Sequence, residues 1–133
     1  MKKKLFAALA AFVMAAGAFA QDFPAYLKMS GTVITGCDKS RLPENLVIPD
    51  GVTKIGYNAF GVCKSLMSVT IPESAEKISD EAFRKCVTLR NISLPGSVTA
   101  IGERAFRDCH NLVVQFGGTK EQWNAKSFTP PIF

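Results

Sequence analysis

The segment Leu46–Ser68, LVIPDGVTKIGYNAFGVCKSLMS, recurs twice further along the chain. The second copy is Val69–Asn91, VTIPESAEKISDEAFRKCVTLRN, and the third is Ile92–Val113, ISLPGSVTAIGERAFRDCHNLV. Five residue types recur every 23 residues: Pro49, Pro72 and Pro95; Ile55, Ile78 and Ile101; Phe60, Phe83 and Phe106; Cys63, Cys86 and Cys109; Leu66, Leu89 and Leu112. A fixed period of this length is typical of a stacked-repeat architecture. The chain is therefore predicted to form a solenoid in which equivalent side chains stack in columns.

Each copy opens with the alternating pattern of a short strand. Leu46 and Ile48 alternate with Val47, so the first two are expected in the core and Val47 outside. A proline then ends the strand, because it cannot donate a hydrogen bond to the ladder. A second short extended piece follows at 52–55, 75–78 and 98–101.

The last part of each copy holds Ala-Phe, with Cys three residues beyond Phe and Leu three beyond Cys. Apolar residues at i, i+3 and i+6 fit one face of a short helix or 3₁₀ turn. Ser79, Asp80 and Glu81 have the composition of an N-cap and an acidic first turn. The expected fold class is α/β, with short parallel strands joined by short helical corners.

Caps are expected at both ends, because an end coil otherwise exposes its apolar face. At the N-terminal end, residues 31–35 are a β-branched run typical of a strand, and a turn-rich stretch follows. We divide the chain into a leader (1–20), an N-terminal cap with a partial coil (21–45), three repeats (46–68, 69–91 and 92–113) and a C-terminal cap with a tail (114–133).

In the C-terminal cap, Val114 and Phe116 are expected to take core positions of a last strand. Thr119 and Gln122 have the spacing of a capping box, which predicts a helix over the residues TKEQWNAK. This helix would lay Trp123 over the last coil.

The leader has the pattern of a secretory signal peptide. Three lysines precede an apolar run at 5–19, and the small-x-small triplet at 18–20 predicts cleavage after Ala20. A transmembrane anchor is the alternative, but the run is shorter than the about 20 apolar residues that a span needs. We expect a secreted, periplasmic or cell-surface protein without a membrane span after the leader is removed.

The basic charge of the chain belongs mostly to this leader. Its removal takes three of the sixteen Lys and Arg and none of the eleven acidic residues, so the formal charge falls from +5 to 13 − 11 = +2. The remaining charges are mixed in sign, and a nucleic-acid partner is therefore not expected. The same mixture on the outer rim of the coils is typical of a solvated surface.

Four cysteines in an exported chain would usually suggest a disulfide framework. Cys63, Cys86 and Cys109 instead share one repeat position, which favours a ladder of small buried thiols. Neighbouring coils lie about 4.8 Å apart, within disulfide reach, so a bridge between two ladder cysteines is an open alternative. Cys37 lies outside the 23-residue register.

The repeat unit resembles the BspA-type leucine-rich repeat, also called the Treponema-type repeat, of bacterial surface proteins. The match runs Leu66-x-x-Val69-x-Ile71-Pro72-x-x-Ala75-x-x-Ile78-Ser79-x-x-Ala82-Phe83-x-x-Cys86, and the segment 116–124, FGGTKEQWN, is similar to the end piece of such arrays. The resemblance covers about residues 31–126. It implies a curved solenoid with strands on the inner face, export, and protein binding, including adhesion in some members.

No cluster of catalytic or metal-ligating residues stands out. His110, the only histidine, lies in a polar turn, and the acidic pair Asp80-Glu81 is explained by a helix start. The cysteine spacings are not those of a zinc site. We therefore expect no metal and no cofactor, and a hydrolase using Asp80, Glu81 or His110 is the least favoured reading.

The outward strand positions form a small, nearly uncharged surface, which we name the candidate binding face. Repeat proteins commonly bind through their concave strand surface. The face consists of Asn45, Val47, Ser68, Thr70, Asn91, Ser93 and Gln115. The expected function is non-enzymatic binding of a protein partner, including a host or neighbouring-cell protein. The alternative is a structural subunit that associates with itself in the envelope.

Overall fold

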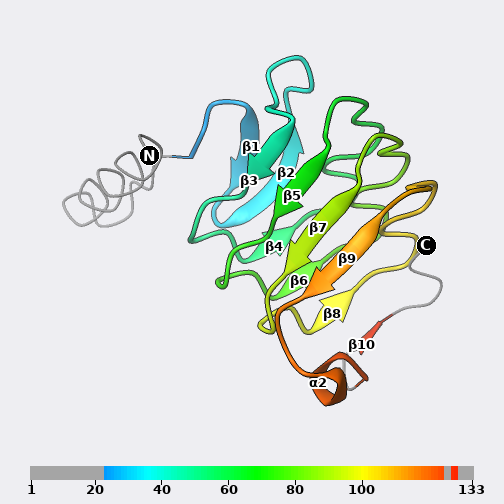
Figure 1. Ribbon diagram of the computed structural model, residues 1–133. Coiled ribbons are helices and arrows are strands. Elements are labelled where there is room, and N and C mark those ends of the chain that lie inside the picture. The colour runs from blue at the N-terminus through cyan, green and yellow to red at the C-terminus, as the bar shows by residue number, and fades with distance from the viewer. Residues whose placement is uncertain (1–22, 125–126, 129–133) are drawn as a thin grey trace, which may run out of the picture.

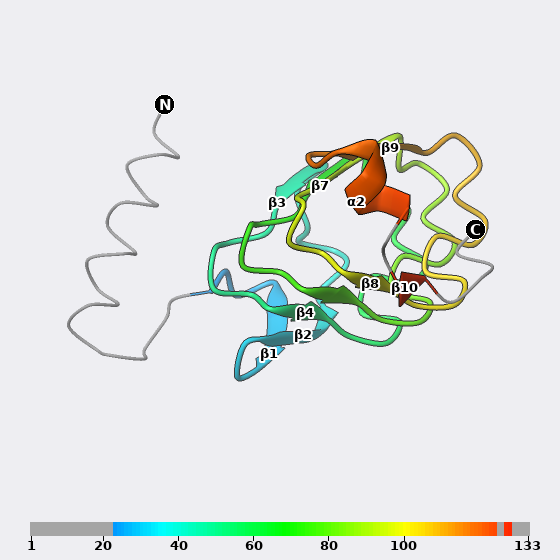
Figure 2. The ribbon, with the colours of Figure 1, turned by 90° about the horizontal axis from the view of Figure 1, so that it is seen from below.

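The computed structural model describes residues 23–124 and 127–128, which wind into a solenoid with a sheet on each of two opposite sides (Figures 1 and 2). The first sheet is parallel and four-stranded, in the order β3 (Asn45–Val47), β5 (Ser68–Thr70), β7 (Asn91–Leu94), β9 (Val113–Phe116). The second is six-stranded, in the order β1 (Leu27–Ser30), β2 (Val33–Cys37), β4 (Lys54–Ile55), β6 (Lys77–Ile78), β8 (Ala100–Ile101), β10 (Ser127–Phe128). Each repeat contributes one strand to each sheet, which confirms the predicted solenoid.

The strands pair in the register that the period predicts. In the four-stranded sheet Leu46 lies beside Val69, and Val69 beside Ile92. In the six-stranded sheet Ile55 pairs with Ile78, and Ile78 pairs with Ile101 in turn. All of these side chains are buried between the two sheets. The core is thus a set of columns that run through all three repeats.

The three phenylalanines form the most regular column. The rings of Phe60 and Phe83 are stacked with centroids 5.2 Å apart, and those of Phe83 and Phe106 with centroids 5.8 Å apart. All three side chains are fully buried. Burial of a side chain of this size stabilises a fold by about 1.5–3 kcal/mol, so the column is a main source of stability.

The corner that carries each phenylalanine differs from the expected helix or 3₁₀ turn. The amide of Phe60 donates to the carbonyl of Ala82 in the next coil at 2.8 Å, and Phe83 donates to Ala105 in the same way. Because these amides bond between coils, they are not available for bonds along a helix. Six non-glycine residues in the corners have positive φ, at two positions that repeat every 23 residues: Asn58, Val62, Glu81, Lys85, Arg104 and Asp108.

This geometry also corrects the predicted helix start at Ser79-Asp80-Glu81. Glu81 has a φ of 58°, in the left-handed region, and so cannot belong to a right-handed helix. Asp80 accepts a hydrogen bond from the amide of Glu103 in the next coil, at 2.8 Å, rather than from its own turn. The acidic residues thus hold neighbouring coils together.

The N-terminal cap is a β-hairpin. β1 pairs antiparallel with β2, and Gly31, with a φ of 63°, lies in the turn between them. The expected strand at 31–35 is present two residues later, as β2. β1 was not expected from the sequence. It places a buried Leu27 over the first coil.

The C-terminal cap contains the predicted capping box. The Thr119 side-chain oxygen accepts from the amide of Gln122 at 3.0 Å, and the Gln122 side chain accepts from the amide of Thr119 at 2.8 Å. The helix that follows is α2 (Lys120–Asn124), and residues 125–126 lie outside the described part of the chain. Trp123 is partly buried against the core, as predicted.

Candidate functional site

The candidate binding face lies on the outer surface of the four-stranded sheet. Its residues form two columns, one of Asn45, Ser68 and Asn91 and the other of Val47, Thr70, Ser93 and Gln115. Alternation along each strand places these side chains opposite the core. Ser68 and Ser93 are half-buried and the other five residues are exposed. The face therefore presents amides, hydroxyls and one valine, and carries no charge.

Two neighbouring side chains of the first column contact each other. The Ser68 hydroxyl donates to the side-chain oxygen of Asn45 at 2.8 Å. In the second column, Val47 is 62% exposed and is the most apolar part of the face. The cross-strand pair of Asn45 and Ser68 contributes to the stability of the sheet and orients these two side chains.

An open depression of about 370 Å³ lies at the end of the second column. Thr70, Ser93 and Gln115 line it together with residues that follow the strands, among them Glu73 and Pro95. The candidate binding face is thus continuous with a recess whose lining includes one carboxylate.

Val113 is a member of the face that the sequence reasoning missed. It pairs with Asn91 and so completes the first column, and its side chain is 55% exposed. The available signal was the one-residue shortening of the register after Leu112. With Val114 directed inward, Val113 must be directed outward.

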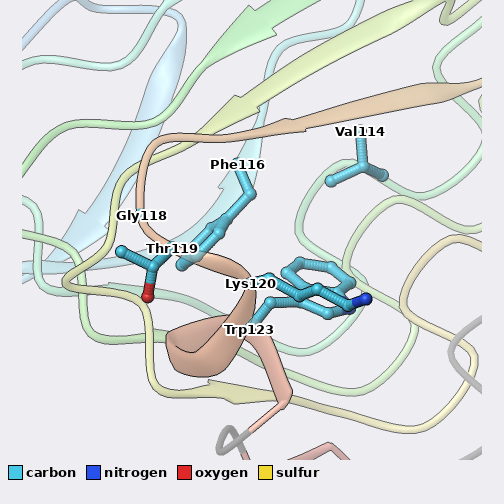
Figure 3. Close-up of a pocket in the computed structure, with 6 residues that line it drawn as sticks. All are labelled: Val114, Phe116, Gly118, Thr119, Lys120 and Trp123. Carbon is cyan, nitrogen blue, oxygen red and sulfur yellow. The ribbon is translucent and has the colours of Figure 1, made fainter.

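A second open depression, of about 300 Å³, lies at the C-terminal end of the solenoid, between β9 and α2 (Figure 3). Val114 and Phe116 line it from the strand, and Lys120 and Trp123 line it from the helix. The rings of Phe116 and Trp123 lie 5.3 Å apart and are tilted by 59°. Both side chains pack against the core, so this region serves first as the cap.

The residues considered for catalysis are placed in structural roles or on the surface. Glu81 accepts a long hydrogen bond of 3.4 Å from the hydroxyl of Tyr57, and Asp80 bonds to the next coil as described above. His110 is exposed in a turn. Among the described residues, no group of three or more His, Cys, Asp or Glu side chains is placed to hold a metal ion.

The outer-rim charges include local ion pairs. Arg104 lies 3.2 Å from Glu103, and Arg107 lies 3.8 Å from Asp108. Exposed pairs of this kind contribute about 0–1 kcal/mol, and they are typical of a solvated surface.

All four cysteines are buried thiols. Cys37 belongs with the ladder in space, although it lies outside the register in sequence. Its sulfur is 3.9 Å from the sulfur of Cys63. This shared hydrogen bond raises the pKa of Cys37, and burial raises it further, whereas the same bond lowers the pKa of Cys63.

The parallel coils, the columns of Ile, Phe and Leu and the polar strand face define a leucine-rich-repeat solenoid. The chain belongs to the BspA-type leucine-rich-repeat family. The family model described as BspA type Leucine rich repeat region matches residues 37–128 in six copies. Members of this family are typically surface or secreted proteins, and their repeats generally act as protein-interaction modules. The fold is typically a non-enzymatic scaffold.

Two solved bacterial structures are similar. A leucine-rich repeat protein of T. pallidum is 31% identical over 73% of this chain and 48% of its own, with a TM-score of 0.59. A leucine-rich repeat protein of Eubacterium ventriosum is 26% identical over 64% of this chain and 23% of its own, with a TM-score of 0.60. The chain thus spans less than half the length of either protein. No curated protein matches the chain significantly.

The predicted export signal and the absence of a membrane-spanning helix among the described residues concern different parts of the chain. The predicted signal peptide, residues 1–20, lies outside the described residues. Within the residues that the structure describes, no helix has both the length and the apolar character needed to cross a membrane.

Proposed function

We propose that this protein is exported and binds another protein, without catalysis, through the candidate binding face. The observation that carries the proposal is the pair of outward-facing, uncharged and mostly polar columns on β3, β5, β7 and β9, which are continuous with an open recess. Membership of a family of interaction modules supports it. The partner class is a cell-surface or extracellular protein of a host or of a neighbouring cell.

The composition of the face favours recognition by hydrogen bonds and shape. Amides and hydroxyls both donate and accept, so they can pair with polar groups of a partner in several ways. Without a charged group on the face, binding should depend little on salt, because screening acts on charges. A partner that binds here should therefore be retained at high ionic strength.

A capture assay tests the proposal. The chain would be immobilised and offered extracellular-matrix proteins and cell-surface extracts, beside a Thr70→Glu/Ser93→Glu variant. Thr70 and Ser93 are paired outward positions on β5 and β7, so each new carboxylate would project from the face. We expect saturable capture by the original protein and at least a tenfold weaker affinity for the variant, because a buried unpaired charge at an interface is costly.

The matched control is Ser65→Glu/Asn111→Glu, which adds the same charge at exposed positions in the turns that precede β5 and β9, outside the strands of the face. It should bind as the original protein does. Equal capture by the face variant would refute the placement of the site, and absence of capture by all three proteins would refute binding of this partner class.

Self-association in the envelope is the second candidate function. It is favoured by one observation: β9 ends the four-stranded sheet, and such an edge strand can pair with another chain. Mass in solution across a range of concentrations separates the two functions. Growth of oligomers with concentration would support self-association, and a constant monomer mass would exclude it.

A further inference from the structure

The three ladder cysteines share a repeat position but not an environment. The thiols of Cys86 and Cys109 each donate to a carbonyl oxygen 26 residues earlier in the chain, in Phe60 and Phe83, at 3.1 Å. The residue 26 positions before Cys63 is Cys37. All four sulfurs neighbour one another along the ladder, but Cys86 and Cys109 direct their thiols to carbonyl oxygens, whereas Cys63 lies 3.9 Å from the sulfur of Cys37.

We propose that Cys37 and Cys63 form a disulfide bond that links the N-terminal cap to the first repeat. Their sulfurs are already 3.9 Å apart. A disulfide requires about 2.05 Å, so the two atoms must approach by about 1.9 Å, a movement that side-chain rotation can supply.

Within this pair, Cys37 is the thiol that an oxidant can reach. Cys37 is 8% exposed and Cys63 is 1% exposed, and Cys37 ends β2, a strand of the N-terminal hairpin. Elements at the ends of a fold open more readily than its centre. Cys86 is completely buried. An oxidant can therefore reach the pair from the side of Cys37.

The reaction needs an oxidant, which we name as a small disulfide such as oxidised glutathione. The Cys37 thiol loses its proton and attacks the disulfide, forming a mixed disulfide and releasing one glutathione thiolate. The Cys63 thiolate then attacks the Cys37 sulfur and releases the second glutathione. Two protons leave the protein, and two electrons pass to the oxidant. Each attack requires a thiolate, so the reaction should accelerate with rising pH.

The cross-link would stabilise the cap without changing the core. It closes a loop between residues 26 apart, and a loop of this size lowers the entropy of the unfolded chain. The equilibrium constant for unfolding should fall on the order of a hundredfold or more. The unlinked protein would stay folded, because the columns of the three repeats do not depend on the bond.

Peptide mapping tests the inference on the full chain. The protein would be equilibrated with oxidised and reduced glutathione, blocked with an alkylating reagent and digested with trypsin. Cleavage after Lys39, Lys64 and Arg90, among other sites, leaves each cysteine on a separate peptide. We expect one cross-linked pair, joining the peptides of Cys37 and Cys63, and two alkylated cysteines.

Two variants complete the test. Cys86→Ser should keep the cross-link, because Cys86 takes no part in it, whereas Cys37→Ser should lose it. Oxidation should raise the unfolding midpoint of the original protein and of Cys86→Ser but leave Cys37→Ser unchanged. Four alkylated cysteines in a fully oxidising buffer, or a cross-link between Cys63 and Cys86, would overturn the inference. A link between two chains would overturn it as well.

Discussion

Replacement of Phe83 by alanine tests whether the phenylalanine column stabilises the solenoid. Phe83 is fully buried and stacks on an aromatic ring on each side, at 5.2 and 5.8 Å. Truncation of a buried phenylalanine costs about 3–5 kcal/mol, through lost burial and the cavity left behind. Small domains are stable by only about 5–15 kcal/mol, so Phe83→Ala should leave the protein marginally folded.

Thermal and urea unfolding, followed by circular dichroism, would measure the loss. A change of 1 kcal/mol moves the midpoint of a domain of this size by about 4–8 °C, so the Tm should fall by at least about 12 °C. Because the coils are coupled through their neighbours, loss of the middle ring should weaken the whole array in one transition.

Phe60→Ala is the comparison, because Phe60 stacks on one ring of the column, Phe83, whereas Phe83 stacks on two. An aromatic pair contributes about 0.5–1.5 kcal/mol beyond burial, so Phe83→Ala should cost more by that amount. A cost below about 2 kcal/mol for Phe83→Ala would contradict the reasoning. A larger cost for Phe60→Ala would show that stacking on two sides adds nothing.

Three further predictions concern backbone and charge. Gly56→Ala should lower stability by about 1–3 kcal/mol in urea unfolding, since its Cβ would lie 2.6 Å from the carbonyl oxygen of Ile34. Val62→Asn should raise stability by about 1 kcal/mol in the same assay, because Val62 has a φ of 61° that asparagine tolerates better. The hydrogen bond from Ser40 holds the pKa of Asp38 below its ordinary value. Ser40→Ala should therefore raise that pKa in an NMR titration.

Each of these has its own control. Gly36→Ala should be nearly neutral, because the nearest atom to its Cβ is the flexible end of Lys28, at 3.6 Å. A destabilised Val62→Asn would show that the left-handed backbone is not strained. At pH values above the ordinary pKa of an aspartate, the lowered pKa of Asp38 contributes to the stability of the fold. This contribution is lost as the pH falls through the lowered pKa. An unchanged Asp38 pKa in Ser40→Ala would assign the shift to another group.

The columns could be predicted from the sequence because a constant period forces equivalent residues into contact. Ile55, Ile78 and Ile101 lie together for that reason alone. The corners could not be predicted in the same way. The spacing of Phe, Cys and Leu suits a helix and a turn equally, and only the bonds between coils distinguish them.

The other differences have similar causes. β1 is short and lies outside the repeat, so no period indicated that Leu27 pairs with Cys37. The exposed columns follow from strand alternation, and their positions were therefore predictable. The identity of the partner could not be predicted, because the fold does not constrain which side chains occupy exposed positions such as those of Asn45 and Thr70. Any polar residue there leaves the core intact.

The hydrogen bonds between coils make length an evolvable property of this protein. Each coil bonds only to its neighbours, so duplication of 23 codons would add one residue to every column and give each coil an equivalent neighbour. Insertion of one codon would instead shift every column on one side of it. Genes for such arrays should therefore grow and shrink by whole units, and point insertions should survive only at the caps.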